Sequence, residues 1–545
     1  MSEISRTYMA PRRAGGPRRR VRRPSPMRRR GGMVTTLLVL LLVGGAAWIF
    51  WGTRDSHSMA ELIPAGQKYE AFFGRFLSKR HHIADSAIWS LTPADSRLAE
   101  APTLLRNNFG LPEWALNHIV YGPCHVSGRN VNNFSDVLLV TKMSRIGCLA
   151  EKFHRFLGVS QDPAGGLALR YLPHADVYYA VRGRVLVVSP ARDTVIRAVT
   201  LRADDALAQE ALDRGLGEAG TADIYGRFAL TEEDPLGDAF QEVRVLCHFE
   251  EQSLTTAMNV RLATPWRGRL SRLLANTEPA ALGTPPAGML QLSANFGKSF
   301  GEVCLSLARI FDPSGRFEEV WASWKALDYD AAPGVGPLLA HVAGPAGPGW
   351  QISWRGIDEN EMLPVPLLAA TLDLPAQQAQ ERFEAFPPLP EGAWPWEAYP
   401  RYDAEDDRAY VPMIGGPSIE PSATNQGDTL FLCSSRTTLD NLRQTGAPAD
   451  TLAEPGNLYL RLVPKPAMEP IVAAGAQLAE NGFLRGYDRA EFLADAEQWL
   501  SLGGKMREIT ALAGHQNGDI ACTLRIIMTD ITDEQGDAQA ANPAK

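Results

Sequence analysis

The residues that could carry chemistry are scattered, and no familiar catalytic spacing joins them. Ser189 lies where a predicted strand meets a predicted helix, a place that suits a nucleophile or a helix N-cap. The cap is favoured, because there is no G-x-S-x-G and no S-x-x-K accompanied by its partner motifs. His81 and His82 are adjacent and cannot share a helix face, and His118 and His125 are separated by a predicted turn. With no H-E-x-x-H, the histidines predict no metal site.

Two loops contain groups that bind ions in other proteins. Asp358, Glu359 and Glu361 beside Asn360 could ligate calcium, but the spacing and glycine of an EF-hand loop are absent. The run GPAGPGW at 344–350 has no Lys-Ser or Lys-Thr, and its prolines remove amide donors that a phosphate would need. We therefore expect no catalytic residue, no metal and no cofactor.

The cysteines show no C-x-x-C spacing, so they predict neither a zinc site nor a redox motif. The six are Cys124, Cys148, Cys247, Cys304, Cys433 and Cys522. In the internal alignment given next, Gln378 stands opposite Cys148 and Ser189 stands opposite Cys433. The repeated fold therefore requires no disulfide, and Cys124 with Cys148 is the one pair that merits a test.

The elements that must position these side chains occur twice. Residues 137–156 align without a gap to residues 367–386, and in both an apolar run gives way to a helical stripe. Five of the twenty aligned positions are identical: Leu138 with Leu368, Thr141 with Thr371, Glu151 with Glu381, Phe153 with Phe383, and Phe156 with Phe386. The pattern predicts one strand feeding one helix in each half of the chain.

Further segments repeat in the same order. Residues 183–199 align with 427–443 as a turn, a strand and a helix, and Gly183 and Gly427 suit the turn because glycine tolerates positive φ. The preceding run 176–181 reads as a hairpin partner of the strand after Gly183. Two closing strands in each half, joined by short connections, favour an antiparallel meander.

The fold class expected is α+β: one N-terminal transmembrane helix followed by two tandem, homologous, mainly antiparallel sheet-plus-helix domains. The boundaries expected are a basic cytoplasmic tail at 1–32, the transmembrane helix at 33–52, a linker at 53–61, the first copy at 62–265, a linker at 266–283, the second copy at 284–530, and a disordered tail at 531–545.

The charge distribution supports this topology. Residues 1–30 hold eleven Arg and one Glu, so a net charge of -8 for the chain leaves -18 on the remainder. An acidic body argues against nucleic acid as a partner. Residues 33–51 are uncharged and apolar, about long enough to cross a bilayer, and the arginines before them predict a cytoplasmic N-terminus. Bulky residues at 48–51 and the lack of an A-x-A site favour a signal-anchor over a cleaved signal peptide, which stays the alternative.

The second half contains a longer loop, residues 387–426, that is rich in proline, aromatic and acidic residues. Loops of this length inside a domain are commonly functional. Its aromatic residues are candidates for contact with a partner, although they could instead pack on their own domain. They are Trp394, Trp396, Tyr399, Tyr402 and Tyr410.

Three features resemble a family of bacterial membrane-anchored envelope proteins defined by a domain of unknown function. They are the LIPA opening at 62–65 after an N-terminal anchor, the G-x-x-L-x-x-S strand at 183–189 running into a helix, and the tandem arrangement. The resemblance implies a single-pass protein of the inner membrane with periplasmic domains, and it implies no enzyme activity.

The function expected from these observations is a non-enzymatic binding or scaffold domain of the envelope. Its expected partners are membrane lipid through residues 33–52 and an envelope protein or cell-wall component. The alternative is a periplasmic enzyme whose site lies in a cleft between the two copies.

Overall fold

The computed structural model describes most of the chain from Arg29 to Thr529. The described residues are 29–94, 96–108, 111–130, 136–156, 163–164, 166–173, 176–231, 237–274, 279–312, 314–328, 334–358, 364–389, 391–392, 394, 397–413, 416–445, 450–516 and 519–529. They fall into two compact units that divide between Arg54 and Asp55. Residues 1–28 of the expected basic tail, the expected C-terminal tail and three of the calcium candidates (Glu359, Asn360 and Glu361) lie outside the described residues.

The first unit contains one described helix, α1 (Arg29–Gly52). Across the parts of the chain that the structure describes, no helix combines the length and the apolar character needed to cross a membrane. This finding contradicts the transmembrane helix that the expected fold class contained.

The second unit alternates strands and helices from end to end. Short 3-10 and π segments are labelled η. The helical segments are η2 (Ala60–Leu62), α2 (Phe76–Asp85), η3 (Ala87–Leu91), η4 (Arg97–Glu100), α3 (Ala101–Arg106), α4 (Glu113–Ile119), α5 (Arg145–Phe156), α6 (Arg192–Val199), η5 (Ala203–Asp205), α7 (Gln209–Thr221), α8 (Thr264–Leu274), α9 (Phe300–Phe311), α10 (Arg316–Lys325), η6 (Leu338–Ala343), α11 (Ala376–Glu384), η7 (Pro417–Ile419), α12 (Arg436–Thr445), α13 (Pro464–Glu480) and α14 (Arg489–Gly504).

The strands are β1 (Tyr69–Phe73), β2 (Cys124–Gly128), β3 (Leu138–Lys142), β4 (Pro163–Ala164), β5 (Leu167–Ala168), β6 (Arg170–Leu172), β7 (Val177–Arg182), β8 (Val185–Ser189), β9 (Ile224–Ala229), β10 (Phe240–Phe249), β11 (Ser253–Leu262), β12 (Leu290–Asn295), β13 (Gly349–Asp358), β14 (Val365–Asp373), β15 (Arg401–Asp403), β16 (Arg408–Tyr410), β17 (Ser422–Gln426), β18 (Thr429–Cys433), β19 (Leu458–Leu462), β20 (Met506–Gln516) and β21 (Asp519–Met528).

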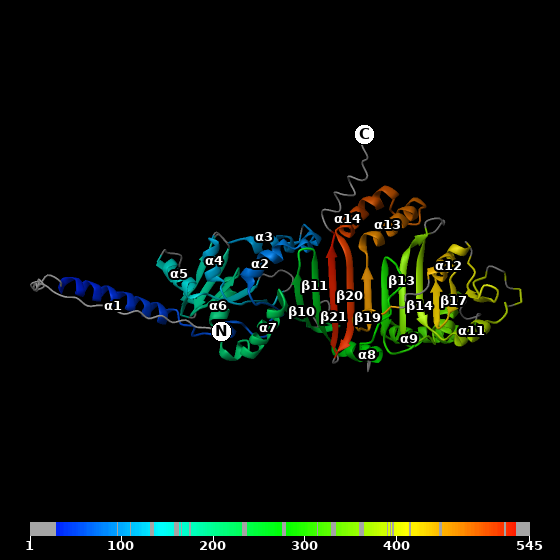
Figure 1. Cartoon of the computed structure of the whole chain (residues 1–545), viewed down its shortest axis with the longest axis horizontal. Helices are drawn as coiled ribbons and strands as arrows, with labels where there is room; N and C mark the ends of the chain where they lie inside the picture. The colour runs from blue at the N-terminus through cyan, green and yellow to red at the C-terminus, as the bar shows by residue number, and fades with distance from the viewer. Residues whose placement is uncertain are drawn as a thin grey trace, which may run out of the picture. The chain divides into compact units, whose positions relative to one another are not determined.

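All of these strands except β4 and β5, which pair with each other, belong to one antiparallel sheet. The pairings run through the first half in the order β6, β7, β8, β3, β2, β1, β9, β10, β11. They continue through the second half as β21, β20, β19, β12, β13, β14, β18, β17, β16, β15. Figure 1 shows β10, β11, β21 and β20 side by side where the halves meet.

The expectation of two separate sheet-plus-helix domains is wrong, because β11 pairs with β21 over eight residue pairs and makes one sheet of the two halves. An unpaired strand edge leaves a row of backbone N–H and C=O groups without protein partners. Here each half ends in a ten-residue strand, and the two strands pair with each other, so the backbone groups at each edge gain partners. One sheet therefore runs through both halves, and α8 occupies the first part of the expected linker at 266–283.

Each half follows the same strand order from its outer edge to this junction, apart from the extra outermost strand β15. The counterparts are β6 and β16, β7 and β17, β8 and β18, β3 and β14, β2 and β13, β1 and β12, β9 and β19, β10 and β20, and β11 and β21. Ala257 and Thr523, the fifth residues of β11 and β21, pair with each other. The junction therefore has a local two-fold relation between equivalent positions.

The strand register shifts the internal alignment by one residue along β3 and β14, so the identities of Leu138 with Leu368 and of Thr141 with Thr371 are lost. The pairings of β3 with β2 and β8, compared with those of β14 with β13 and β18, place Leu138 opposite Ala369 rather than Leu368. Burial agrees, since Leu138 and Ala369 are buried whereas Leu368 is 42% exposed. A one-residue shift moves a side chain to the other face of a sheet.

Each half has its own apolar core, formed mainly on opposite faces of the shared sheet. In the first half, Phe72 and Val140 pack with Val195 of α6 and Leu212 of α7. In the second half, the core contains Ala294 and Trp350 of the sheet with helical residues such as Val303, Leu338 and Ala379. Burying these apolar surfaces provides the main stabilisation of each half.

Candidate functional site

Charged side chains cross the sheet at the junction of the halves. Glu70 of β1 lies opposite Arg227 of β9, which lies opposite Arg244 of β10. Glu242, two residues before Arg244, lies opposite Arg261 of β11. Since side chains two residues apart share a face of a strand, all of these point to the same side. We call Glu70, Arg227, Glu242, Arg244, Arg261 and Asp519 the junction ladder.

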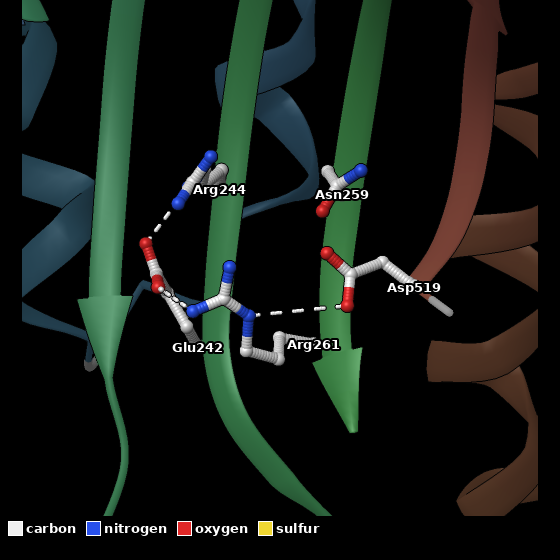
Figure 2. Close-up of a pocket in the computed structure, with 5 residues that line it drawn as sticks. All are labelled: Glu242, Arg244, Asn259, Arg261 and Asp519. Carbon is white, nitrogen blue, oxygen red and sulfur yellow. Dashed lines mark hydrogen bonds and ion pairs between the residues drawn. The ribbon is translucent and has the colours of Figure 1, made fainter. Parts of the chain in front are cut away.

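Glu242 is the centre of the junction ladder. Its Oε1 lies 2.7 Å from Arg244 Nε and 2.9 Å from Arg227 Nε, and its Oε2 lies 3.5 Å from Arg261 Nη1. Arg227 also reaches Glu70, with 3.0 Å between Nη1 and Oε2. Figure 2 shows Glu242 between Arg244 and Arg261, with Arg261 extending towards Asp519 of β21. The chain of contacts therefore joins strands of both halves.

The carboxylates of the ladder are covered, whereas its guanidinium groups are partly open to solvent. Glu70 and Glu242 side chains are 4% and 10% exposed, but those of Arg227, Arg244 and Arg261 are 42–44% exposed. Burial opposes ionisation of both glutamates. Hydrogen bonds and charges from His125 and Arg227 at Glu70, and from Arg244 and Arg227 at Glu242, nevertheless hold the pKa of each below its usual range.

The second half contains a reduced version of the same arrangement. Arg461 of β19, the counterpart of Arg227, contacts Glu508 of β20 with 2.7 Å between Nη2 and Oε2. Its Nη1 donates to Oε1 of Gln291 at 2.9 Å, and Gln291 occupies the position of Glu70. The arginine and one carboxylate are thus present in both halves, while the remaining ladder residues, Arg244, Arg261 and Asp519, belong to the junction.

The ladder is filled rather than hollow. Glu242, Arg244, Asn259, Arg261 and Asp519 line a shallow depression with essentially no free volume between them. The two halves meet here by strand pairing, so the junction offers no support for the expected alternative of an enzyme site in a cleft. What it presents to a partner is a group of guanidinium donors, and guanidinium groups suit carboxylate and phosphate oxygens.

The histidines and Ser189 take structural positions. Ser189 is buried, and its hydroxyl accepts from the amide of Ala191 at 3.1 Å. The N-cap of α6 is Ala191, so the expectation that Ser189 caps this helix is wrong. His82 contacts the carbonyl of Phe249. His118 lies 3.1 Å from the Ser144 hydroxyl, and buried His125 has its Nε2 3.6 Å from Glu70 Oε1.

All six cysteines are free. Burial raises the pKa of Cys124 and of Cys433 to about 12, which keeps both as thiols at neutral pH. Among the described residues, no group of three or more His, Cys, Asp or Glu could hold a metal ion.

The aromatic candidates of the loop at 387–426 have different surroundings, and some of them pack against other side chains of the same half. Part of this loop forms β15, β16 and β17 at the edge of the sheet. Tyr402 stacks on Phe383 with ring centroids 5.6 Å apart, and Arg408 lies over the ring of Tyr410 at 4.3 Å. Tyr399 is half-buried, whereas Trp394 is 59% exposed. Trp396 lies outside the described residues.

Sequence reasoning missed the junction ladder. A signal was present, since Arg244 alternates with apolar Val243 and Val245 in the first closing strand expected for the first half, residues 243–249, and Glu242 directly precedes that strand. Alternation alone could not show which residues of distant strands lie beside them.

No protein-family model matches the chain, and the search of curated proteins found no match either. Among solved structures, crystal form III of TP0453 is similar over 41% of this chain and 90% of that chain, with 9% identity and a TM-score of 0.24. Crystal form I of TP0453 covers 41% of this chain and 87% of its own, with 8% identity and the same TM-score. A likeness this weak supports no conclusion about either fold or function.

Proposed function

We propose that this protein is a non-enzymatic binding or scaffold protein of the bacterial envelope, and that its junction ladder binds an anionic envelope partner, either a protein or a cell-wall component. The observation that carries the proposal is the exposed guanidinium row fixed over buried carboxylates. Because the carboxylates are already buried, the arginines are held in place before a partner arrives, which lowers the entropy cost of binding.

Charge supports the choice of an anionic partner. Arg227, Arg244, Arg261 and nearby Arg267 outnumber the carboxylates of Glu70, Glu242 and Asp519, on a body that otherwise carries a large negative charge. Arginine has five N–H donors, so a guanidinium that contacts one glutamate retains donors for a second group. Such a local cationic surface favours acidic groups and is sensitive to salt.

The same proposal places the protein at the inner membrane, with residues 33–52 in contact with membrane lipid and the folded unit in the periplasm. Its support is the arginine-rich beginning of the sequence followed by an uncharged apolar run, together with the resemblance to the envelope family. Fractionation and protease accessibility in spheroplasts test this placement. Recovery of the intact protein in the cytosol would contradict it.

The partner is tested by chemical crosslinking and co-purification from membranes, with wild type compared to the double variant Arg244→Gln with Arg261→Gln. We expect the double variant to lose the co-purified partner and the wild-type complex to weaken as salt rises. Arg309→Gln is the matched control, because Arg309 is an exposed arginine that pairs with Glu318 away from the ladder. Thermal unfolding verifies that each variant is folded. An unchanged partner set in a folded double variant would remove the ladder from the proposal.

Trp394 is tested separately as a candidate contact. If the exposed indole belongs to the partner surface, Trp394→Ala reduces recovery of the same partner, whereas Tyr402→Phe does not, because Tyr402 is packed on Phe383. Equal recovery with both variants would limit the binding surface to the sheet junction.

A further inference from the structure

A second polar site lies in the first half, away from the junction ladder. It is a surface groove of about 400 Å³ between η2, the end of β7 and the segment that leads into α7. Small-molecule sites have volumes of about 300–1,000 Å³, so this groove has room for a compact ligand. Its lining residues are Ser58, Ala60, Glu61, Arg182, Leu201, Ala203, Ala206, Leu207 and Gln209.

Two backbone contacts hold the walls of the groove together. The amide of Leu207 donates to the carbonyl of Ile63 at 2.8 Å, and the amide of Ala65 donates to the carbonyl of Asp205 at 2.9 Å. The Ser58 hydroxyl adds a hydrogen bond to the side chain of Gln209. The segments on the two sides of the groove are therefore fixed relative to each other.

The groove contains one charge of each sign. Glu61 is oriented by the Ser58 amide, 3.2 Å from its Oε1, and by His57 Nδ1, 3.1 Å from its Oε2. Burial opposes ionisation of Glu61, but the Ser58 hydrogen bond, His57 and the charge of Arg182 lower its pKa below the usual range. Within the described residues, no carboxylate lies close enough to Arg182 to form an ion pair, although Arg182 lines the same groove as Glu61.

The second half keeps the backbone of this region but not its charges. There the amide of Leu452 donates to the carbonyl of Leu282 at 2.8 Å, which matches the contact of Leu207 with Ile63. Gln426 occupies the position of Arg182 in the equivalent hairpin turn. Ala280 occupies the position of Glu61, because each lies two residues before the residue whose carbonyl accepts this hydrogen bond. In the second half this backbone contact therefore forms without a charge at either position.

We propose that this groove binds a small zwitterion of amino-acid or dipeptide size. Arg182 receives the carboxylate of the ligand, Glu61 receives its ammonium group, and Leu201 and Leu207 contact its apolar side chain. The inference rests on the groove alone and does not depend on the partner assigned to the junction ladder.

Isothermal titration of the full-length protein in detergent tests the proposal with L-leucine and L-alanyl-L-leucine as probes. Their N-acetylated forms lack the ammonium group, and their amides lack the carboxylate. We expect saturable binding of at least one free compound, weakened at least about tenfold by either blocking group, because each removes a charge-assisted hydrogen bond.

The variants Arg182→Gln and Glu61→Gln should each weaken the same binding at least about tenfold. Arg182→Gln introduces the residue that the second half has at this turn, so the variant is expected to fold. Arg202→Gln is the matched control, because Arg202 is exposed beside the groove but does not line it. The absence of saturable binding for both free compounds would overturn the proposal. So would equal binding of the blocked compounds, or wild-type affinity in both groove variants when thermal unfolding shows them folded.

Discussion

Glu242 shows how one residue stabilises the junction through charge. Its side chain is 10% exposed and lies within ion-pair distance of Arg227, Arg244 and Arg261. In the unfolded chain all four groups are hydrated and separate, so the folded state binds the proton of Glu242 less tightly than the unfolded state does. This part of the stability is present above the ordinary glutamate pKa of about 4.3 and is lost as the pH falls through the lower folded value.

Replacing Glu242 with Gln should therefore destabilise the protein at pH 7 and have less effect in acid. We expect Glu242→Gln to lower the free energy of unfolding by about 2 kcal/mol at pH 7, since hydrogen bonds to charged groups contribute about 1.5–3 kcal/mol. The difference from wild type should shrink as the pH drops below about 4. Urea unfolding at several pH values measures it, with exposed Glu497→Gln as the control. A difference that does not change with pH would assign the effect to packing instead of charge.

At the scale of elements, the strand β14 shows what an ungapped alignment conceals. The sequence pairs Leu138 with Leu368 because both are leucine, but hydrogen-bonding with β13 and β18 places Ala369 at the buried position. Phe383 of α11, aligned with Phe153, is buried in the core of the second half, as the helical stripe predicts. The strand alignment therefore shifts by one residue from the alignment by identity.

Substitutions at two neighbouring positions test this register. Leu368→Asp should change the free energy of unfolding by less than about 0.5 kcal/mol, because the side chain is exposed. Ala369→Asp should cost at least about 3 kcal/mol, because it buries a carboxylate without a partner. Thermal unfolding of the two variants measures both values. If Leu368→Asp proved the more damaging, the alignment by identity would be correct and the register wrong.

At the scale of the whole second unit, the junction turns two similar halves into one cooperative body. Strands β10, β11, β21 and β20 pair along nearly their full lengths, so separation of the halves would expose the backbone of β11 and β21. Glu242, Arg244, Arg261 and Asp519 of the junction ladder lie on these strands, and the contact of Arg261 with Asp519 joins the halves.

We therefore expect a single calorimetric unfolding transition for residues 55–529, in place of the two transitions that separate domains would give. Leu524→Pro should split this transition into two, because the amide of Met528 donates to Gln252 across the junction, amides alternate along a strand, and the amide of Leu524 therefore also faces β11 near the middle of the junction. Leu524→Val, which keeps the amide, is the matched control and should retain one transition. Two transitions in the wild-type protein would show that strand pairing at the junction does not couple the halves.

The sequence alone determined those elements that depend on neighbouring residues. The strand after Gly183 and its helix are confirmed as β8 and α6, the hairpin with the preceding run is confirmed by the pairing of β7 with β8, and the closing strands of the first half pair as β10 and β11. Each of these rests on periodicity, turn residues or short connections, which act within about ten or twenty residues.

The tertiary structure alone decided how the halves meet, which residue of β14 is buried, and that Glu242, Arg261 and Asp519 lie together. Ser253 of β11 is separated from its partner Ile527 of β21 by more than half of the chain. Edge strands pair through backbone groups that every residue has, so no side-chain pattern identifies the partner strand. Contacts between side chains on different strands follow from that pairing, and for this reason both the ladder and the groove became visible only in three dimensions.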